Sequence, residues 1–108
     1  MITFVAVWNI AQGVSDSEFE RWYSHVHIAD AKRIPGLIGY RTNRAVDRSK
    51  QQFYRMAELS FEDMQSFEVA FASAEWKHAF VDAQNYITDH QRLVFETTQQ
   101  DLAEHTDG

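Results

Sequence analysis

The sequence contains no cysteine, a single proline and four glycines among 108 residues. Without cysteine the chain cannot form disulfides, use a thiolate nucleophile, or bind zinc or an iron–sulfur cluster through sulfur. It also lacks an apolar run approaching the roughly 20 residues of a membrane-spanning helix. Its apolar N-terminus has neither a basic flank nor a small-residue cleavage site. We therefore expect a cytoplasmic protein with no membrane partner.

Positive charge is scarce, since ten Lys and Arg against 16 Asp and Glu give a net charge of −6. Binding of nucleic acid requires a basic surface, so we expect no nucleic-acid partner. Eight of the ten basic residues precede position 56. Part of this group is either an ordinary solvated face or a basic corner that attracts an anionic substrate. The corner would consist of Arg41, Arg44, Arg48, Lys50 and Arg55.

Aromatic residues are abundant, at 14% of the chain, and they predict a real core and a possible ligand pocket. Residues 2–9 favour a strand that is apolar on both faces. A helix is predicted from its N-cap, Ser15, to the Pro35-Gly36 pair that ends it. The remaining predicted elements are strands over 37–46 and 53–59, a helix from near Ser60 with Met64, Phe67, Val69 and Phe71 in the core, a helical segment from Ala74, and a strand over 91–98.

The predicted order, β-α-β-β-α-β, is typical of the ferredoxin-like α+β sandwich. Two helices cover only one face of a four-stranded sheet, so the second apolar face needs another cover. A second copy of the chain is the simplest cover, which predicts a homodimer with its sheets face to face, a dimeric α+β barrel. We expect one domain over residues 1–98 and a flexible acidic tail over 99–108.

The first predicted helix carries the candidate catalytic residues. His27 lies at the edge of its apolar stripe, where an imidazole could reach a cavity and act as a general acid/base. Asp30 follows three residues later and could orient that imidazole, or could simply be solvated. Tyr23 could donate a hydrogen bond to a substrate oxygen, or could be a core tyrosine. The stripe itself comprises Phe19, Trp22, Tyr23, Val26, Asp30 and Ile34.

Four further residues are candidates for substrate binding. Asn9 could hold a carbonyl or oxyanion, although an asparagine at a strand end is often a turn residue. Tyr40 and Trp76 could form pocket walls or pack in the core. His78 could contact a ligand or haem, or be exposed. The histidines lack the H-E-x-x-H spacing of a metal-binding helix, so we expect no metal site, and His90 is interpreted as a surface residue.

Several of these residues together resemble the EthD-like family of dimeric α+β barrel proteins. The resemblance rests on the segment from Phe19 to His27, on Pro35-Gly36-Leu37 with Tyr40, on the Ala57–Phe61 run, and on Trp76. It implies the ferredoxin-like fold, a homodimer, and a pocket between helices and sheet that works without a cofactor. It also raises the expectation that His27 is catalytic. Fold resemblance does not select one reaction among those of the wider superfamily.

The function favoured is a cofactor-independent lyase or isomerase acting on a small oxygenated cyclic or aromatic compound. Dehydration, lactone isomerisation and retro-addition each need only a proton moved beside a polarised oxygen, which His27 could provide. Two alternatives remain open. One is a cofactor-free monooxygenase of a phenol or quinol. The other is a non-enzymatic dimer that binds a small ligand or haem through His27 or His78.

Overall fold

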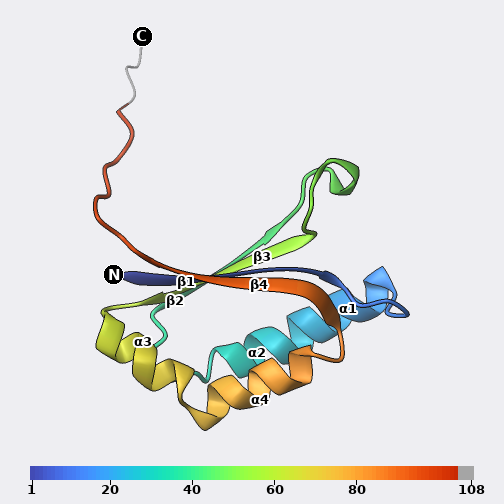
Figure 1. Cartoon of the computed structure of the whole chain (residues 1–108), viewed down its shortest axis with the longest axis horizontal. Coiled ribbons are helices and arrows are strands. Elements are labelled where there is room, and N and C mark those ends of the chain that lie inside the picture. Colours follow the sequence, from blue (N-terminus) through green and yellow to red (C-terminus); the bar gives the residue numbers. More distant parts are fainter. Residues whose placement is uncertain (105–108) are drawn as a thin grey trace.

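The computed structural model, described over residues 1–104, is a four-stranded antiparallel sheet with its helices packed on one face (Figure 1). The strands are β1 (Ile2–Ile10), β2 (Gly39–Arg44), β3 (Arg55–Phe61) and β4 (Ile87–Glu96). The helices are α1 (Asp16–Trp22), the π-helical turn η1 (Tyr23–His27), α2 (Ile28–Ala31), the 3-10 turn η2 (Arg48–Lys50), α3 (Met64–Phe71) and α4 (Ala74–Ala83).

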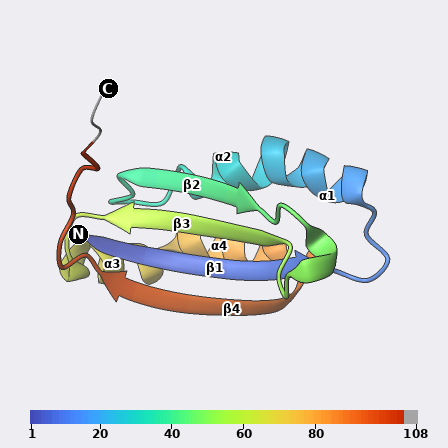
Figure 2. The same cartoon turned by 90° about the horizontal axis from the view of Figure 1, so that it is seen from above.

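The strands lie in the order β2-β3-β1-β4, and every neighbouring pair is antiparallel (Figure 2). β1 and β3, the central strands, carry the most apolar sequences, because their helix-facing side chains are enclosed by the core. Together with the order of elements along the chain, this topology confirms the predicted ferredoxin-like α+β sandwich.

The first helix begins where the sequence predicts. The Ser15 hydroxyl accepts a hydrogen bond of 3.1 Å from the backbone N–H of Glu18, which satisfies one of the free donors of the first turn. Pro35 follows the end of the helix, and Gly36 adopts φ +79°, a conformation that favours glycine. Between these ends the helix is not continuous as predicted, because η1 inserts a π turn between α1 and α2.

The π turn changes which residues face the sheet. A regular helix with Phe19 and Tyr23 inward would also turn Val26 and Asp30 inward. The wider turn holds one extra residue, so the inward positions move one residue along the chain. Val26, predicted to face the core, is 43% exposed, whereas Ala31 is buried.

The sequence misplaced most of the core contacts of α3. β3 continues through Phe61, and α3 begins only after its N-cap, Asp63. Phe67 is buried as predicted, together with Ala70. The other three predicted core residues lie on the solvent side, because a short helix on the sheet surface buries only one narrow stripe. The exposed residues are Met64, Val69 and Phe71.

The second face of the sheet carries no helix in the described part of the chain. Leu93 and Phe95 of β4 are about half exposed there, next to Val5 of β1. The strand starts and ends earlier than the predicted 91–98. Residues 97–104 form neither helix nor strand, and the last four residues of the predicted tail lie outside the described residues. Within residues 1–104, no helix is long and apolar enough to cross a membrane.

Candidate functional site

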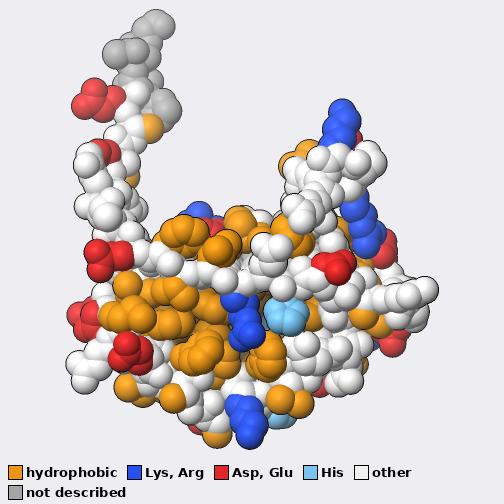
Figure 3. Space-filling view, viewed as in Figure 1, with side chains coloured by type: hydrophobic (Ala, Val, Ile, Leu, Met, Phe, Trp, Pro, Cys, Tyr) orange, Lys and Arg blue, Asp and Glu red, His pale blue; other side chains and the backbone are white. Residues whose placement is uncertain are grey.

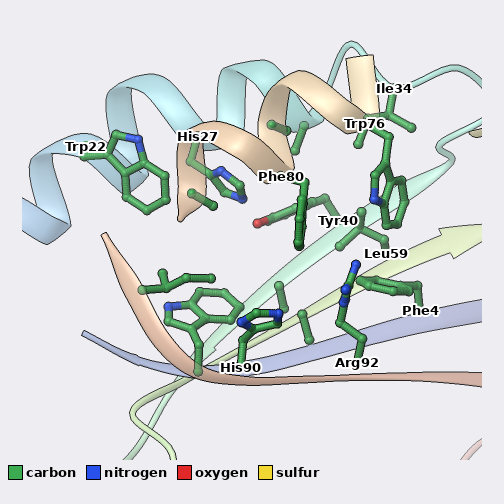
Figure 4. A pocket seen from close by; sticks show the side chains of 17 residues that line it. Phe4, Trp22, His27, Ile34, Tyr40, Leu59, Trp76, Phe80, His90 and Arg92 are labelled. Carbon is green, nitrogen blue, oxygen red and sulfur yellow. The ribbon is translucent and has the colours of Figure 1, made fainter. Parts of the chain in front are cut away.

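A cavity of about 90 Å³ lies between the helices and the sheet (Figure 4). Its walls are mostly aromatic and aliphatic, with side chains from β1, β3, α1, α2 and α4. A dry cavity of roughly 150 Å³ can hold benzene, so a ring ligand would need small shifts of the side chains at the mouth. The labelled wall residues in Figure 4 are Phe4, Trp22, Ile34, Leu59, Trp76 and Phe80, and the polar ones are His27, Tyr40, His90 and Arg92.

His27 ends the π turn, and its imidazole points into this cavity (Figure 4). The ring packs against the indole of Trp22, with 4.8 Å between ring centres. Burial lowers the pKa of His27, although the charges of Asp30 and Asp82 partly oppose this shift. The imidazole is therefore neutral at neutral pH and able to accept a proton. Its Nδ1 atom is buried and has no hydrogen-bond partner within residues 1–104.

Tyr40 brings a hydroxyl group to the same cavity from β2. This hydroxyl lies 2.6 Å from that of Tyr23, which is buried behind it and does not line the cavity. Burial raises the pKa of both tyrosines, so both remain protonated at neutral pH. Of the two tyrosines proposed from the sequence, only Tyr40 is placed to touch a ligand directly.

A charged group supports the tyrosine pair. Arg55 of β3 is buried, and its guanidinium pairs with Glu20 of α1. The Arg55 Nη1 also donates to the Thr42 hydroxyl at 3.1 Å, and the guanidinium carbon lies 5.0 Å from the centre of the Tyr23 ring. The positive charge of Arg55 lowers the pKa of Tyr23 and of Tyr40, against the larger opposite effect of burial. It therefore makes both hydroxyls stronger hydrogen-bond donors.

Asp30 and His78 contact each other between two helices. Asp30 Oδ2 lies 3.3 Å from His78 Nε2 of α4 and Oδ1 lies 3.9 Å from Arg33 Nη1. Neither Asp30 nor His78 lines the cavity. Asp30 influences His27 through its charge, with no hydrogen bond between the two side chains. The interaction of Asp30 with His27, proposed from helical spacing, is thus electrostatic only, because the π turn directs the carboxylate toward α4.

Asn9 also lies outside the cavity. Its Nδ2 donates to the backbone oxygen of Gln52 at 3.0 Å, and its Oδ1 accepts from the backbone N–H of Tyr54 at 2.9 Å. The amide therefore ties the end of β1 to the segment before β3, as asparagine often does near turns.

His90 and Arg92 line the cavity from β4, although the sequence predicts a surface position for His90 and no pocket role for Arg92. Between Val7 and Asn9 of β1 the register shifts, and Asp89 adopts φ +57° in the extra residue of a β-bulge. The extra residue changes which residues of β4 face the helices. After the bulge, the side chains of His90 and Arg92 point to the helix side. A pattern of alternating apolar residues does not contain this signal.

Four of the five residues of the basic corner have a carboxylate partner in the described chain. Arg48 pairs with Asp16 at 2.9 Å, and Arg41 and Lys50 have carboxylates at 3.9 and 3.8 Å. None of the five basic residues lines the cavity. Residues 1–104 contain no group of three or more His, Asp or Glu side chains that could hold a metal ion.

This fold and cavity define a ferredoxin-like α+β protein with an apolar pocket between its sheet and its helices. The sequence profile of the EthD domain matches residues 11–91. The chain therefore belongs to the EthD family, as the sequence motifs around His27 indicate. No curated protein matches the chain in sequence.

Solved structures of similar fold agree with this assignment. An EthD family protein from Bacillus halodurans has a TM-score of 0.80 and 23% identity, over 91% of this chain and 99% of that one. SnoaB of Streptomyces nogalater, a cofactor-independent oxygenase, has a TM-score of 0.71 and 21% identity, over 95% and 97%. A dimeric ferredoxin-like protein from Thermobifida fusca has a TM-score of 0.73 and 12% identity, over 89% and 90%.

Proposed function

We propose that this protein is a cofactor-independent lyase or isomerase that moves a proton on a small oxygenated ring compound. The observation that carries the proposal is the meeting of two groups in one apolar cavity. These are the imidazole of His27, whose pKa burial lowers, and the hydroxyl of Tyr40. Removal of a proton next to a carbonyl requires a general base and a hydrogen-bond donor for the developing oxyanion, and both groups face this cavity.

In this mechanism His27 removes a proton from the carbon next to the substrate carbonyl. The electron pair of the broken C–H bond moves to the carbonyl oxygen, and Tyr40 donates a hydrogen bond to the resulting enolate. Return of the proton from the imidazolium to another carbon completes an isomerisation. Its transfer to a β-hydroxyl group, which leaves as water, completes a dehydration. The apolar walls keep water away from the charged intermediate.

Tyr23 acts in this scheme as a positioning residue. When its hydroxyl donates to Tyr40, the proton of Tyr40 remains free for the substrate oxygen. The charge of Arg55 lowers the pKa of both hydroxyls, which strengthens each as a hydrogen-bond donor. Asp30 takes a second indirect part, because its negative charge stabilises the protonated form of His27.

The proposal is tested by hydrogen exchange with a panel of small cyclic ketones, lactones and hydroxyketones in D₂O. The wild-type protein should introduce deuterium next to the carbonyl of its substrate, and His27→Ala should reduce this exchange by about 10²–10⁴-fold. His25→Ala, an exposed histidine of the same turn, is the matched control and should change nothing. Equal exchange by wild type and His27→Ala would contradict the proposal.

A cofactor-free monooxygenase is the second candidate, favoured by the structural similarity to SnoaB, which is described as a cofactor-independent oxygenase. Deprotonation by His27 would here produce an electron-rich phenolate or carbanion that reduces O₂. In oxidation of a ring CH₂ to a carbonyl, one oxygen atom of O₂ becomes the carbonyl oxygen on that carbon, and the other leaves as water with the two hydrogens of the CH₂ group. Oxygen uptake that depends on the substrate distinguishes this reaction from lyase or isomerase chemistry.

We further propose that two copies of the chain form a homodimer through the open face of the sheet. That face presents Leu93, Phe95 and Val5, and large apolar groups grouped on one surface often mark an interface. Two segments extend beyond this face, on the side away from the helices, where a second copy would contact them (Figure 1). They are the segment between β2 and β3 and residues 97–104. A neighbour of the same fold is described as dimeric.

A further inference from the structure

The charge inside the cavity is opposite in sign to that of the whole chain. The chain has a net charge of −6, yet none of the residues lining the cavity is Asp or Glu. Arg92 is the only Lys or Arg among them, and the other ionisable lining groups are two histidines and a tyrosine. An enclosed space with one cation and no carboxylate favours a ligand of negative charge.

Arg92 lies at the mouth of the cavity, opposite Ala6 on the helix-facing side of the sheet. Its guanidinium carbon is 4.5 Å from the centre of the Phe80 ring, and it forms no ion pair with any carboxylate of residues 1–104. His90 lies two residues before Arg92 on the same face of β4, with its ring centre 5.9 Å from that of Phe80. Both side chains point into the cavity (Figure 4).

The space-filling view shows the same arrangement from outside. Figure 3 shows a basic side chain and a histidine next to each other, with hydrophobic side chains around them. Arg92 is exposed at the mouth, so its guanidinium donors are open to a ligand carboxylate, with which they form a charge-assisted, planar pair.

We propose that Arg92 binds a carboxylate group of the substrate and that the protein therefore acts on a small ring compound bearing a carboxylic acid. The inference rests on the proposed function in one respect, which is that it takes the same cavity as the active site. The ring would lie against the indole and phenyl walls, with its acidic group at the mouth. Its reacting carbon would then lie deeper, toward His27 and Tyr40, whereas Arg92 would take no part in the proton transfer.

A purely structural role for Arg92 makes a different prediction. If the guanidinium only covers Phe80 by a cation–π contact, its removal changes the shape of the mouth. Charged and uncharged ligands of the same size would then be affected alike. Benzoate and benzamide form such a matched pair, and binding of either can be followed by tryptophan fluorescence, because all three tryptophans of the chain line the cavity.

The experiment is a titration of the full chain with each probe. Wild type should bind benzoate about tenfold more tightly than benzamide, as expected for one charge-assisted pair. Arg92→Gln should lose this preference and leave benzamide binding within about twofold, while Arg92→Lys should keep part of it. Arg21→Gln, at an exposed position of α1 outside the cavity, is the matched control and should behave like wild type.

Three results would overturn the inference. The first is an equal affinity of the wild type for benzoate and benzamide. The second is an equal loss of affinity for both probes in Arg92→Gln. The third is the absence of binding of either probe at millimolar concentration. The His27→Ala variant separates the inference from the proposed function. Retained benzoate preference in this variant supports the carboxylate site even where the exchange experiment fails. If Arg92→Gln loses the preference for benzoate and the wild type catalyses the deuterium exchange, both the carboxylate site and the proposed function are supported.

Discussion

His27 and His90 face one cavity from opposite walls, and each follows a one-residue irregularity of the backbone. His27 ends a π turn in the first helix, and His90 comes directly after the β-bulge at Asp89. Such irregularities interrupt regular hydrogen bonding and are often found at functional sites, where they redirect a side chain. The coincidence of two of them at one apolar cavity supports its assignment as the active site.

The pH dependence of activity should report the buried state of His27. Because burial lowers its pKa, the acidic limb of the kcat/KM profile should have its midpoint below the usual value of 6.5. The charge of Asp30 raises that pKa, so Asp30→Asn should move the limb to still lower pH. Histidine NMR titration of both proteins checks the shift directly.

Glu75→Gln, an exposed carboxylate at the start of α4, is the control for this pH experiment and should leave the profile unchanged. A profile that is identical in wild type and Asp30→Asn would show that the carboxylate acts only on His78.

The tyrosine pair predicts a graded loss of activity. Tyr40→Phe removes the donor that faces the substrate and should lower kcat by about 10²-fold, as for loss of an oxyanion donor. Tyr23→Phe leaves that donor in place but unsupported, and should cost about tenfold. Steady-state kinetics with the identified substrate measures both, and a larger loss in Tyr23→Phe than in Tyr40→Phe would contradict the assigned roles.

The buried guanidinium of Arg55 should contribute strongly to stability. Replacing it with methionine leaves Glu20 without its cation in a partly buried place. Because the Glu20 side chain is about one third exposed, we expect a loss near or below about 3 kcal/mol, the low end for breaking a buried pair. Urea denaturation measures the change, and Lys77→Met, at an exposed position of α4, is the matched control.

The same pair predicts an acid dependence. Burial alone would raise the pKa of Glu20, but hydrogen bonds from Arg55 and Tyr54, with the charge of Arg55, bring it below 4.5. The ionised carboxylate therefore stabilises the fold at neutral pH, and this contribution is lost as pH falls below about 4.5 through the folded-state pKa. As pH falls through this range, the free energy of unfolding should decrease less in Arg55→Met than in the wild type. An unchanged slope would argue against the pair.

The proposed dimer makes a prediction for the open face of the sheet. Leu93→Asp places a charge among the apolar side chains that two copies would bury together, so the mass in sedimentation equilibrium should fall from dimer to monomer. Val69→Asp, at an exposed position of α3, should remain dimeric. A wild-type monomer at micromolar concentration would overturn the proposal.

The proposed boundary of the domain is tested by truncation. Residues 101–104 are exposed and belong to no helix or strand, and Leu102 is 90% exposed. Removing residues 101–108 should therefore change the free energy of unfolding by less than about 0.5 kcal/mol in thermal or urea melts. A loss several times larger would show that this segment packs, for example against a partner.

The sequence by itself determined the elements and their order. Ser15 predicted the helix start because its hydroxyl binds the free N–H of Glu18, and the apolar residues of 2–9 predicted the first strand. These features depend on neighbours within a few residues, so local patterns contain them. The motif from Phe19 to His27 likewise indicated the EthD family, which the domain match confirms.

Only the tertiary structure decided which side chains share the cavity. The π turn moves Val26 outward and His27 inward, and the bulge at Asp89 turns His90 and Arg92 toward the helices. Each irregularity adds one residue to an otherwise regular element. A single extra residue shifts every following position by one, and no local periodicity records where it falls.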